Sequence, residues 1–126
     1  SSSLRPPTNL IFESWPRMRF DTAAQVQVMT LDSLCAQFGL DWIDFIWCDI
    51  QGCEGDVIQG APKMMPKTKW FFTEYSAGKL YAGQATFSEL PGMLPNFDLY
   101  LDMQGDALFA NKALQTGTSH TASPPP

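Results

Sequence analysis

Residues 42–50, WIDFIWCDI, are dense in β-branched and aromatic side chains. A short apolar run of this kind is typical of a strand that is buried on both faces, as in the middle of a parallel sheet. The following residues, QGCEGD, contain a glycine suited to a sharp turn and lead into a helix through Val57 and Ile58 that ends near Gly60. A buried strand followed directly by a helix is typical of an α/β fold.

Further strands and helices are predicted on both sides of this unit. Upstream, residues 25–29 alternate polar and apolar side chains, which indicates a half-buried strand. Thr30 or Asp32 then caps a helix that Gly39 ends. Downstream we expect a strand at residues 69–75 and a helix from about residue 86. An antiparallel hairpin of residues 97–103 and 107–111 follows. This alternation predicts an α/β layer with a mainly parallel sheet and a C-terminal antiparallel hairpin.

The length of 126 residues suits one domain, which we place at residues 25–111. Residues 1–24 are interpreted as an N-terminal arm. Within the arm, residues 10–20 are expected to form an edge strand or a packed irregular segment, because Pro16 interrupts them. Residues 112–126 lack core side chains and are expected to be a disordered tail.

Composition excludes several classes of function. The formal charge of −5 repels nucleic acids and anionic lipid surfaces. No apolar run approaches the ~20 residues of a membrane span, and no apolar leader opens the chain, so we expect a cytoplasmic protein. Three cysteines and the single His120 argue against a disulfide framework, a zinc site and a His-dependent hydrolase. We expect no metal, and chemistry that rests on carboxylates, hydroxyls and amides.

Polar side chains follow two of the expected strands at the point where each ends. Asp49 and Gln51 follow the first strand, and Glu74, Tyr75 and Ser76 close the second. Because ligands bind beyond the carboxyl ends of strands in open α/β sheets, these five are candidate site residues. The alternatives are that Asp49 and Gln51 cap the next helix and that Glu74 forms a salt bridge with a lysine. A carboxylate at the end of so apolar a strand needs such a partner or a shifted pKa.

The segment DFIWCDIQGCEGDVIQGA, residues 44–61, resembles the FkbM family of S-adenosylmethionine-dependent methyltransferases. The chain has the family's TLD tripeptide at residues 30–32, and the resemblance runs from about Val26 to Asn111. The family pattern I-D-x-x-K-x-D-x-[EQ]-G-x-E is met except at its lysine, which is Trp47 here. The residues that meet it are Ile43, Asp44, Asp49, Gln51, Gly52 and Glu54.

The resemblance implies a partial Rossmann-like methyltransferase sheet that corresponds to the C-terminal half of the family fold. No G-x-G pattern, which would form the cofactor loop, occurs in residues 1–42. By resemblance, Asp49 and Glu74 are the expected catalytic residues, with Asp49 first as the base. Cofactor-binding positions are then Asp49, Ile50 and Gln51, and substrate-binding positions are Gln51, Glu54, Tyr75 and Ser76. Glu54 has the alternative role of placing a negative charge in the first turn of a helix.

Two functions remain open from the sequence. The first is an O-methyltransferase that uses S-adenosylmethionine to methylate a hydroxyl of a small molecule or glycan, such as a sugar or secondary metabolite. The second is a non-catalytic binding or assembly domain of the same ancestry, which lacks the cofactor loop. A sheet without its first strands has an exposed edge, so a homodimer through that edge is a further expectation.

Overall fold

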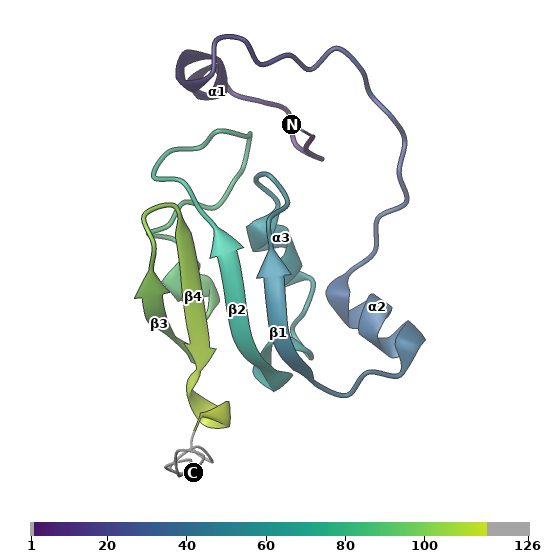
Figure 1. Ribbon diagram of the computed structural model, residues 1–126. Coiled ribbons are helices and arrows are strands. Elements are labelled where there is room, and N and C mark those ends of the chain that lie inside the picture. Colours follow the sequence, from purple (N-terminus) through teal and green to yellow (C-terminus); the bar gives the residue numbers. More distant parts are fainter. Residues whose placement is uncertain (1, 116–126) are drawn as a thin grey trace, which may run out of the picture.

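The computed structural model describes residues 2–115 and shows one four-stranded sheet with helices packed against it (Figure 1). The strand order is β1-β2-β4-β3. The strands are β1 Ile43–Cys48, β2 Thr68–Glu74, β3 Phe97–Asp102 and β4 Asp106–Asn111. The α-helices are α1 Asn9–Ser14, α2 Leu31–Phe38, α3 Glu54–Gln59 and α4 Leu90–Met93. Two short 3-10 turns, η1 Met65–Lys67 and η2 Lys112–Leu114, complete the described elements.

The sheet is mixed, which corrects the expectation of a mainly parallel one. Only β1 and β2 run parallel, whereas β4 is antiparallel to both β2 and β3. The predicted α/β class and the C-terminal hairpin are confirmed. The predicted strand at residues 25–29 does not form, and Val26 and Val28 are exposed there. Alternation of side chains is not enough for a strand, because its backbone N–H and C=O groups also need a partner strand.

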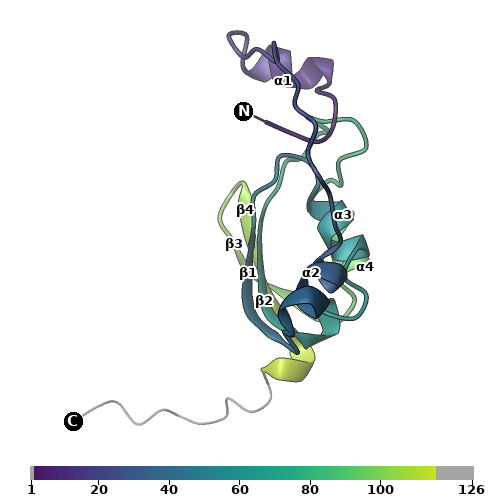
Figure 2. The same ribbon diagram turned by 90° about the vertical axis from the view of Figure 1, so that its right-hand side faces the viewer.

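The core lies between the sheet and one layer of helices. Figure 2 shows α2, α3 and α4 on the same face of the sheet. Buried apolar side chains from both layers meet there, among them Cys35, Ile58, Phe71 and Phe109. All three cysteines are buried and free, as expected of thiols without a disulfide framework.

No described helix covers the other face of the sheet, so the prediction that residues 42–50 are buried on both faces is wrong. Trp47 is 73% exposed on that face, although it stands in an apolar strand. Its ring contacts Phe72 edge-on at 5.5 Å, and Trp70 contacts Tyr100 in the same way at 5.1 Å. Phe45 is also exposed and stacks on Phe72. These five side chains form an uncovered aromatic face.

Capping residues fix the ends of α2 as predicted. The side chain of Thr30 accepts a hydrogen bond from the backbone N–H of Ser33, and Gly39 ends the helix in the left-handed conformation with φ of 65°. The carboxylate of Asp32 instead accepts the backbone N–H groups of Lys63 and Met64. The TLD tripeptide therefore starts α2 and also ties it to the loop that precedes β2.

The predicted segments at both ends of the chain need correction. The arm contains the short helix α1, so it is the packed irregular segment of the two alternatives and not an edge strand. The helix expected from about residue 86 is limited to α4, because residues 87–89 form turns. Residues 112–114 of the predicted tail form η2, which starts where the side chain of Asn111 accepts the N–H of Ala113. The rest of that tail, residues 116–126 with His120, lies outside the described residues.

Candidate active site

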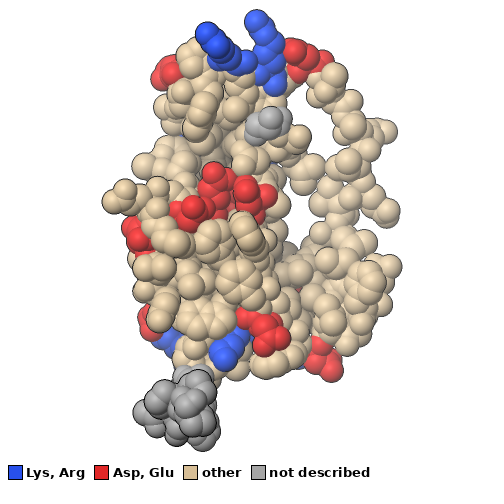
Figure 3. Space-filling view, viewed as in Figure 1, with Lys and Arg blue, Asp and Glu red and all other residues tan. Residues whose placement is uncertain are grey.

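The parallel pairing of β1 and β2 brings three candidate residues together. Cys48 pairs with Thr73, so Asp49 and Glu74 leave the sheet side by side at the carboxyl ends of the two strands. The side-chain nitrogen Nε2 of Gln51 donates to Asp49 Oδ1 at 2.9 Å and to Glu74 Oε2 at 3.1 Å. Figure 3 shows acidic side chains gathered above these strand ends. The strand-end prediction for Asp49, Gln51 and Glu74 agrees with this placement.

The loop between β1 and α3 has an unusual backbone. Gln51 has φ of 53° and Gly52 has φ of 98°, both in the left-handed region. The buried carboxylate of Glu54 stabilises this conformation, because its Oε1 accepts the N–H groups of Ile50 and Gly52, each at 3.2 Å. Glu54 therefore holds the loop, which differs from the substrate-binding role inferred from the resemblance.

The helix-capping alternative for Asp49 and Gln51 is not supported. The N-cap residue of α3 is Cys53, and no side-chain hydrogen bond caps this helix. Glu74 likewise belongs to none of the salt bridges found among residues 2–115. The side chains of these three residues interact with one another instead.

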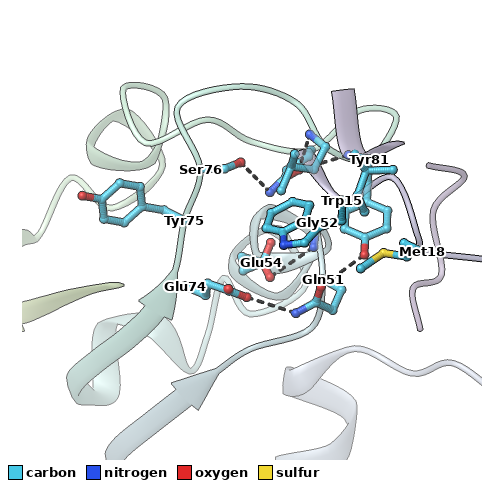
Figure 4. Close-up of a pocket in the computed structure, with 12 residues that line it drawn as sticks. Trp15, Met18, Gln51, Gly52, Glu54, Glu74, Tyr75, Ser76 and Tyr81 are labelled. Atoms are coloured by element: carbon cyan, nitrogen blue, oxygen red, sulfur yellow. Dashed lines mark hydrogen bonds between the residues drawn. The ribbon is translucent and has the colours of Figure 1, made fainter. Parts of the chain in front are cut away.

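Two other predicted site residues interact mainly with their own surroundings. The hydroxyl of Tyr75 donates to Asp102 Oδ1 at 2.6 Å, and its ring stacks on Phe87, so it points away from Glu74 (Figure 4). The hydroxyl of Ser76 donates to the carbonyl of Gly78 and stabilises the loop after β2. Both residues still line the cavity at the strand ends.

Sequence reasoning missed Tyr81, which is central to the site. The side chain is 1% exposed, and its hydroxyl donates to Gln51 Oε1 at 3.1 Å. A Cβ atom at position 52 would lie only 2.8 Å from the ring and Cβ of Tyr81, so glycine is required there for two independent reasons. The LYAGQ motif pointed to this loop, but not to a contact with Gln51 about thirty residues earlier.

The N-terminal arm completes a small cavity at this edge, which sequence reasoning also missed. Trp15 and Met18 extend from the arm toward Gln51 and Tyr81 (Figure 4). The cavity has a volume of about 110 Å³. Arg5 anchors the arm through two hydrogen bonds from its NH2 nitrogen to the carboxylate of Asp56, at 2.7 and 2.8 Å. In the arm sequence, the only hint of this contact was Trp15 followed by Pro16.

The electrostatics of the site favour proton exchange near neutral pH. Partial burial of Glu74, a hydrogen bond with Asp49 and the negative charge of that neighbour raise the pKa of Glu74 to about 7. Asp106 and Glu54 add to the effect. Beneath the site, burial raises the pKa of the Cys48 thiol to about 12, so this thiol stays protonated. The side chains present thus offer a carboxylate pair able to take up or release one proton.

Two features bear on the class of the site. Within residues 2–115, no group of three or more His, Cys, Asp or Glu side chains is arranged to hold a metal ion. None of the helices in the same range is long and apolar enough to cross a membrane. Open α/β sheets bind ligands beyond the carboxyl ends of their parallel strands, and the acidic pair lies at this edge.

Comparison with known proteins identifies the family. The sequence profile of the methyltransferase FkbM domain matches residues 3–101, and the chain belongs to this family. It is 40% identical over 119 residues to a 2-O-methyltransferase, NoeI, of Sinorhizobium fredii (strain NBRC 101917 / NGR234). That alignment covers 90% of this chain and 48% of the relative, so the chain spans about half the length of the curated relative it matches. No solved structure matches the chain.

Proposed function

We propose that this chain contributes the strand-end site of an S-adenosylmethionine-dependent O-methyltransferase. The observation that carries the proposal is the carboxylate pair of Asp49 and Glu74, bridged by the amide of Gln51. Membership of the FkbM family and the name of the 2-O-methyltransferase relative support methyl transfer to oxygen. The pKa of Glu74, raised to about 7 by partial burial and by Asp49, supports acid–base chemistry at this pair.

The acidic edge suits a positively charged cofactor. S-adenosylmethionine supplies a methyl group on a cationic sulfur, and carboxylates attract such a charge in a partly desolvated site. We assign the cofactor side of the edge to Asp49, Ile50 and Gln51, as the resemblance implies. The cavity of about 110 Å³ is small beside the 300–1,000 Å³ of typical ligand sites. The described residues therefore fit the charged end of the cofactor and account for only part of its surroundings.

The carboxylate pair acts on the acceptor hydroxyl. Asp49 is the proposed base: it would orient the acceptor hydroxyl and take its proton as the methyl group passes to the oxygen, with the sulfur–methyl bond of the bound cofactor broken and the neutral thioether released. Glu74 is the second carboxylate of the pair, and the proton taken from the acceptor hydroxyl can be shared between it and Asp49. Gln51 holds both carboxylates in place, and this fixed geometry is a source of rate in itself. Tyr75 and Ser76 border the acceptor side, and Glu54 maintains the loop that carries Gln51.

The acceptor is a small molecule or glycan with a free hydroxyl, such as a sugar or secondary metabolite. The net charge of −5 and the acidic strand ends disfavour nucleic acids and other polyanions. The exposed ring of Trp15 at the cavity offers an apolar surface for one face of such an acceptor. Carboxylates and an amide beside it are suitable partners for hydroxyl groups.

Transfer of a labelled methyl group tests the proposal. Purified protein is incubated with methyl-labelled S-adenosylmethionine and a panel of sugars and other hydroxyl compounds. We expect labelling of at least one acceptor, and a fall of roughly 10²–10⁴-fold in rate for Asp49→Asn, the usual contribution of a general base. Asp98→Asn is the matched control, because Asp98 is an exposed residue of β3 away from the site. Equal rates for the wild type and Asp49→Asn would contradict the assignment of Asp49.

The uncovered aromatic face favours a second candidate, a non-catalytic assembly domain. Contiguous exposed apolar surface of this kind marks interaction sites in soluble proteins. Within residues 2–115 no strand pairs with the outer edge of β1, and this edge could pair with a second copy of the chain. Sedimentation velocity tests the homodimer: we expect a dimer that Trp47→Lys, on the uncovered aromatic face near the end of β1, converts to a monomer. A wild-type monomer at all concentrations would contradict dimerisation.

A further inference from the structure

We propose that Tyr81 is a positioning residue, whose hydroxyl orients the Gln51 amide so that its NH2 group faces both carboxylates. The inference deepens the proposed function, on which its meaning for catalysis rests. Tyr81 acts through Gln51, because its hydroxyl donates to the amide whose nitrogen donates to both carboxylates. It was not among the residues expected from the sequence.

The two ends of the Gln51 amide differ in their hydrogen-bonding chemistry. The Nε2 of Gln51 has two N–H donors, and its Oε1 is only an acceptor. The two donors are directed at Asp49 and Glu74, whereas Oε1 accepts from the Tyr81 hydroxyl. If the amide rotated by half a turn, its oxygen would face two carboxylates, and its nitrogen would face the hydroxyl. Ionised carboxylates can only accept, so they favour this orientation, and the Tyr81 hydroxyl holds the amide oxygen from the other side. Figure 4 shows the Gln51 side chain between Tyr81 and Glu74.

The structure holds the Tyr81 ring rigidly. The ring lies against Gly52 at a distance that leaves no room for a Cβ atom. The backbone of Tyr81 pairs with Pro7 of the arm, and its N–H donates to Gln84 Oε1 at 3.2 Å. With 1% exposure, its hydroxyl has little access to solvent as an alternative partner. The Oε1 end of the amide therefore meets a fixed donor.

The orientation matters because every charged group that raises the pKa of Glu74 is acidic. Asp49 extends from β1, Asp106 from β4 and Glu54 from α3. The N–H donors of Gln51 point at both carboxylates and, as hydrogen-bond donors, are expected to stabilise their ionised forms against this repulsion. Release of the amide weakens this stabilisation. The loss of the Tyr81 hydroxyl is therefore expected to raise the pKa of Glu74 further, without any change in the carboxylates themselves.

A carbon-detected NMR titration of Glu side chains tests the inference without cofactor or acceptor. The Glu74 signal is assigned by its absence in Glu74→Gln. In Tyr81→Phe we expect an upward shift of the Glu74 pKa by about 0.5 or more, the scale of one weakened charge-assisted hydrogen bond. Tyr100→Phe, which removes a hydroxyl from the uncovered aromatic face, should cause no shift. An unchanged Glu74 pKa in folded Tyr81→Phe would overturn the inference.

A double-mutant cycle shows whether Tyr81 acts through Gln51. In the Gln51→Leu background, Tyr81→Phe should no longer change the pKa of Glu74. A shift as large as in the wild-type background would overturn the route through the amide. If Tyr81→Phe does not fold, site-specific 3-fluorotyrosine at position 81 keeps the shape and makes the hydroxyl a stronger donor. The fluorinated residue should lower the pKa of Glu74. An unchanged or raised pKa of Glu74 would contradict the inference.

The titration and the methyl-transfer assay fail independently. A shift in the pKa of Glu74 without methyl transfer would support the positioning role and reject the proposed reaction. Transfer that depends on Asp49, combined with an unchanged titration in Tyr81→Phe, would support the reaction and reject the positioning role.

Discussion

The carboxylates of Asp49 and Glu74 are linked by one amide nitrogen, Nε2 of Gln51, at 2.9 and 3.1 Å. The two acids come from neighbouring parallel strands and are 25 positions apart in the sequence. Without a donor between them, two carboxylates at this separation would repel each other when both are ionised. The relationship makes the pair one unit that gains and loses a proton near neutral pH.

The raised pKa of Glu74 predicts a pH dependence of stability. The folded state keeps the proton up to about pH 7, whereas an unfolded glutamate loses it near its ordinary value of 4.5. Between these values the folded state binds more protons, so stability falls as the pH rises, and the loss is complete above about pH 7. Replacement by Gln removes this contribution. The thermal midpoint of Glu74→Gln should therefore fall less than that of the wild type between about pH 5 and pH 8.

Scanning calorimetry of both proteins across this pH range measures the difference. Glu13→Gln, at an exposed residue of the arm, serves as the control and should follow the wild type. Parallel curves for Glu74→Gln and the wild type would contradict the raised pKa.

Gly52 should not tolerate a side chain. Alanine there would need φ of 98° and would place its Cβ 2.8 Å from Tyr81. We expect Gly52→Ala to lower the free energy of unfolding by about 1–3 kcal/mol, the scale of a strained backbone position. Gly92→Ala is the control, because nothing lies within 4 Å of its added Cβ and it stands in α4. The control should be neutral or stabilising by up to about 1 kcal/mol, and urea unfolding compares the two. Similar effects at both glycines would show that the contact with Tyr81 is unimportant.

Glu54 is expected to stabilise the loop rather than bind substrate. Glu54→Ala removes the acceptor for two backbone N–H groups and should lower the free energy of unfolding by about 1–3 kcal/mol. Glu54→Gln keeps an acceptor oxygen in the same place and should lose less. Urea unfolding of both variants checks the order. A fully stable Glu54→Ala would contradict the loop-stabilising role.

The sequence predicted the centre of the site because its parts are local or follow the strand ends. Asp49 and Gln51 lie within three residues of one another, and Glu74 occupies the equivalent place on the adjacent strand. Parallel pairing is enough to bring such residues together. The roles assigned to Asp49, Glu74, Ile50, Tyr75 and Ser76 stay predictions.

Other features could not be predicted, since they depend on contacts between distant segments. The contact of Tyr81 with Gln51 and the approach of Trp15 to the cavity both require the arm and the loop after β2 to fold over the strand ends. The exposure of Trp47 has a similar cause. An apolar strand shows that its side chains favour burial, but not which face of the sheet the helices will cover.

Calorimetric titration with S-adenosylmethionine tests the central claim, that the Asp49–Glu74 edge receives the cofactor, most directly. We expect binding to the wild type, and affinity at least about tenfold weaker for Asp49→Asn, the scale of one lost charge contact in a partly desolvated site. Asp98→Asn should bind as the wild type does. No heat of binding with the wild type, or equal affinity in the wild type and Asp49→Asn, would contradict the claim.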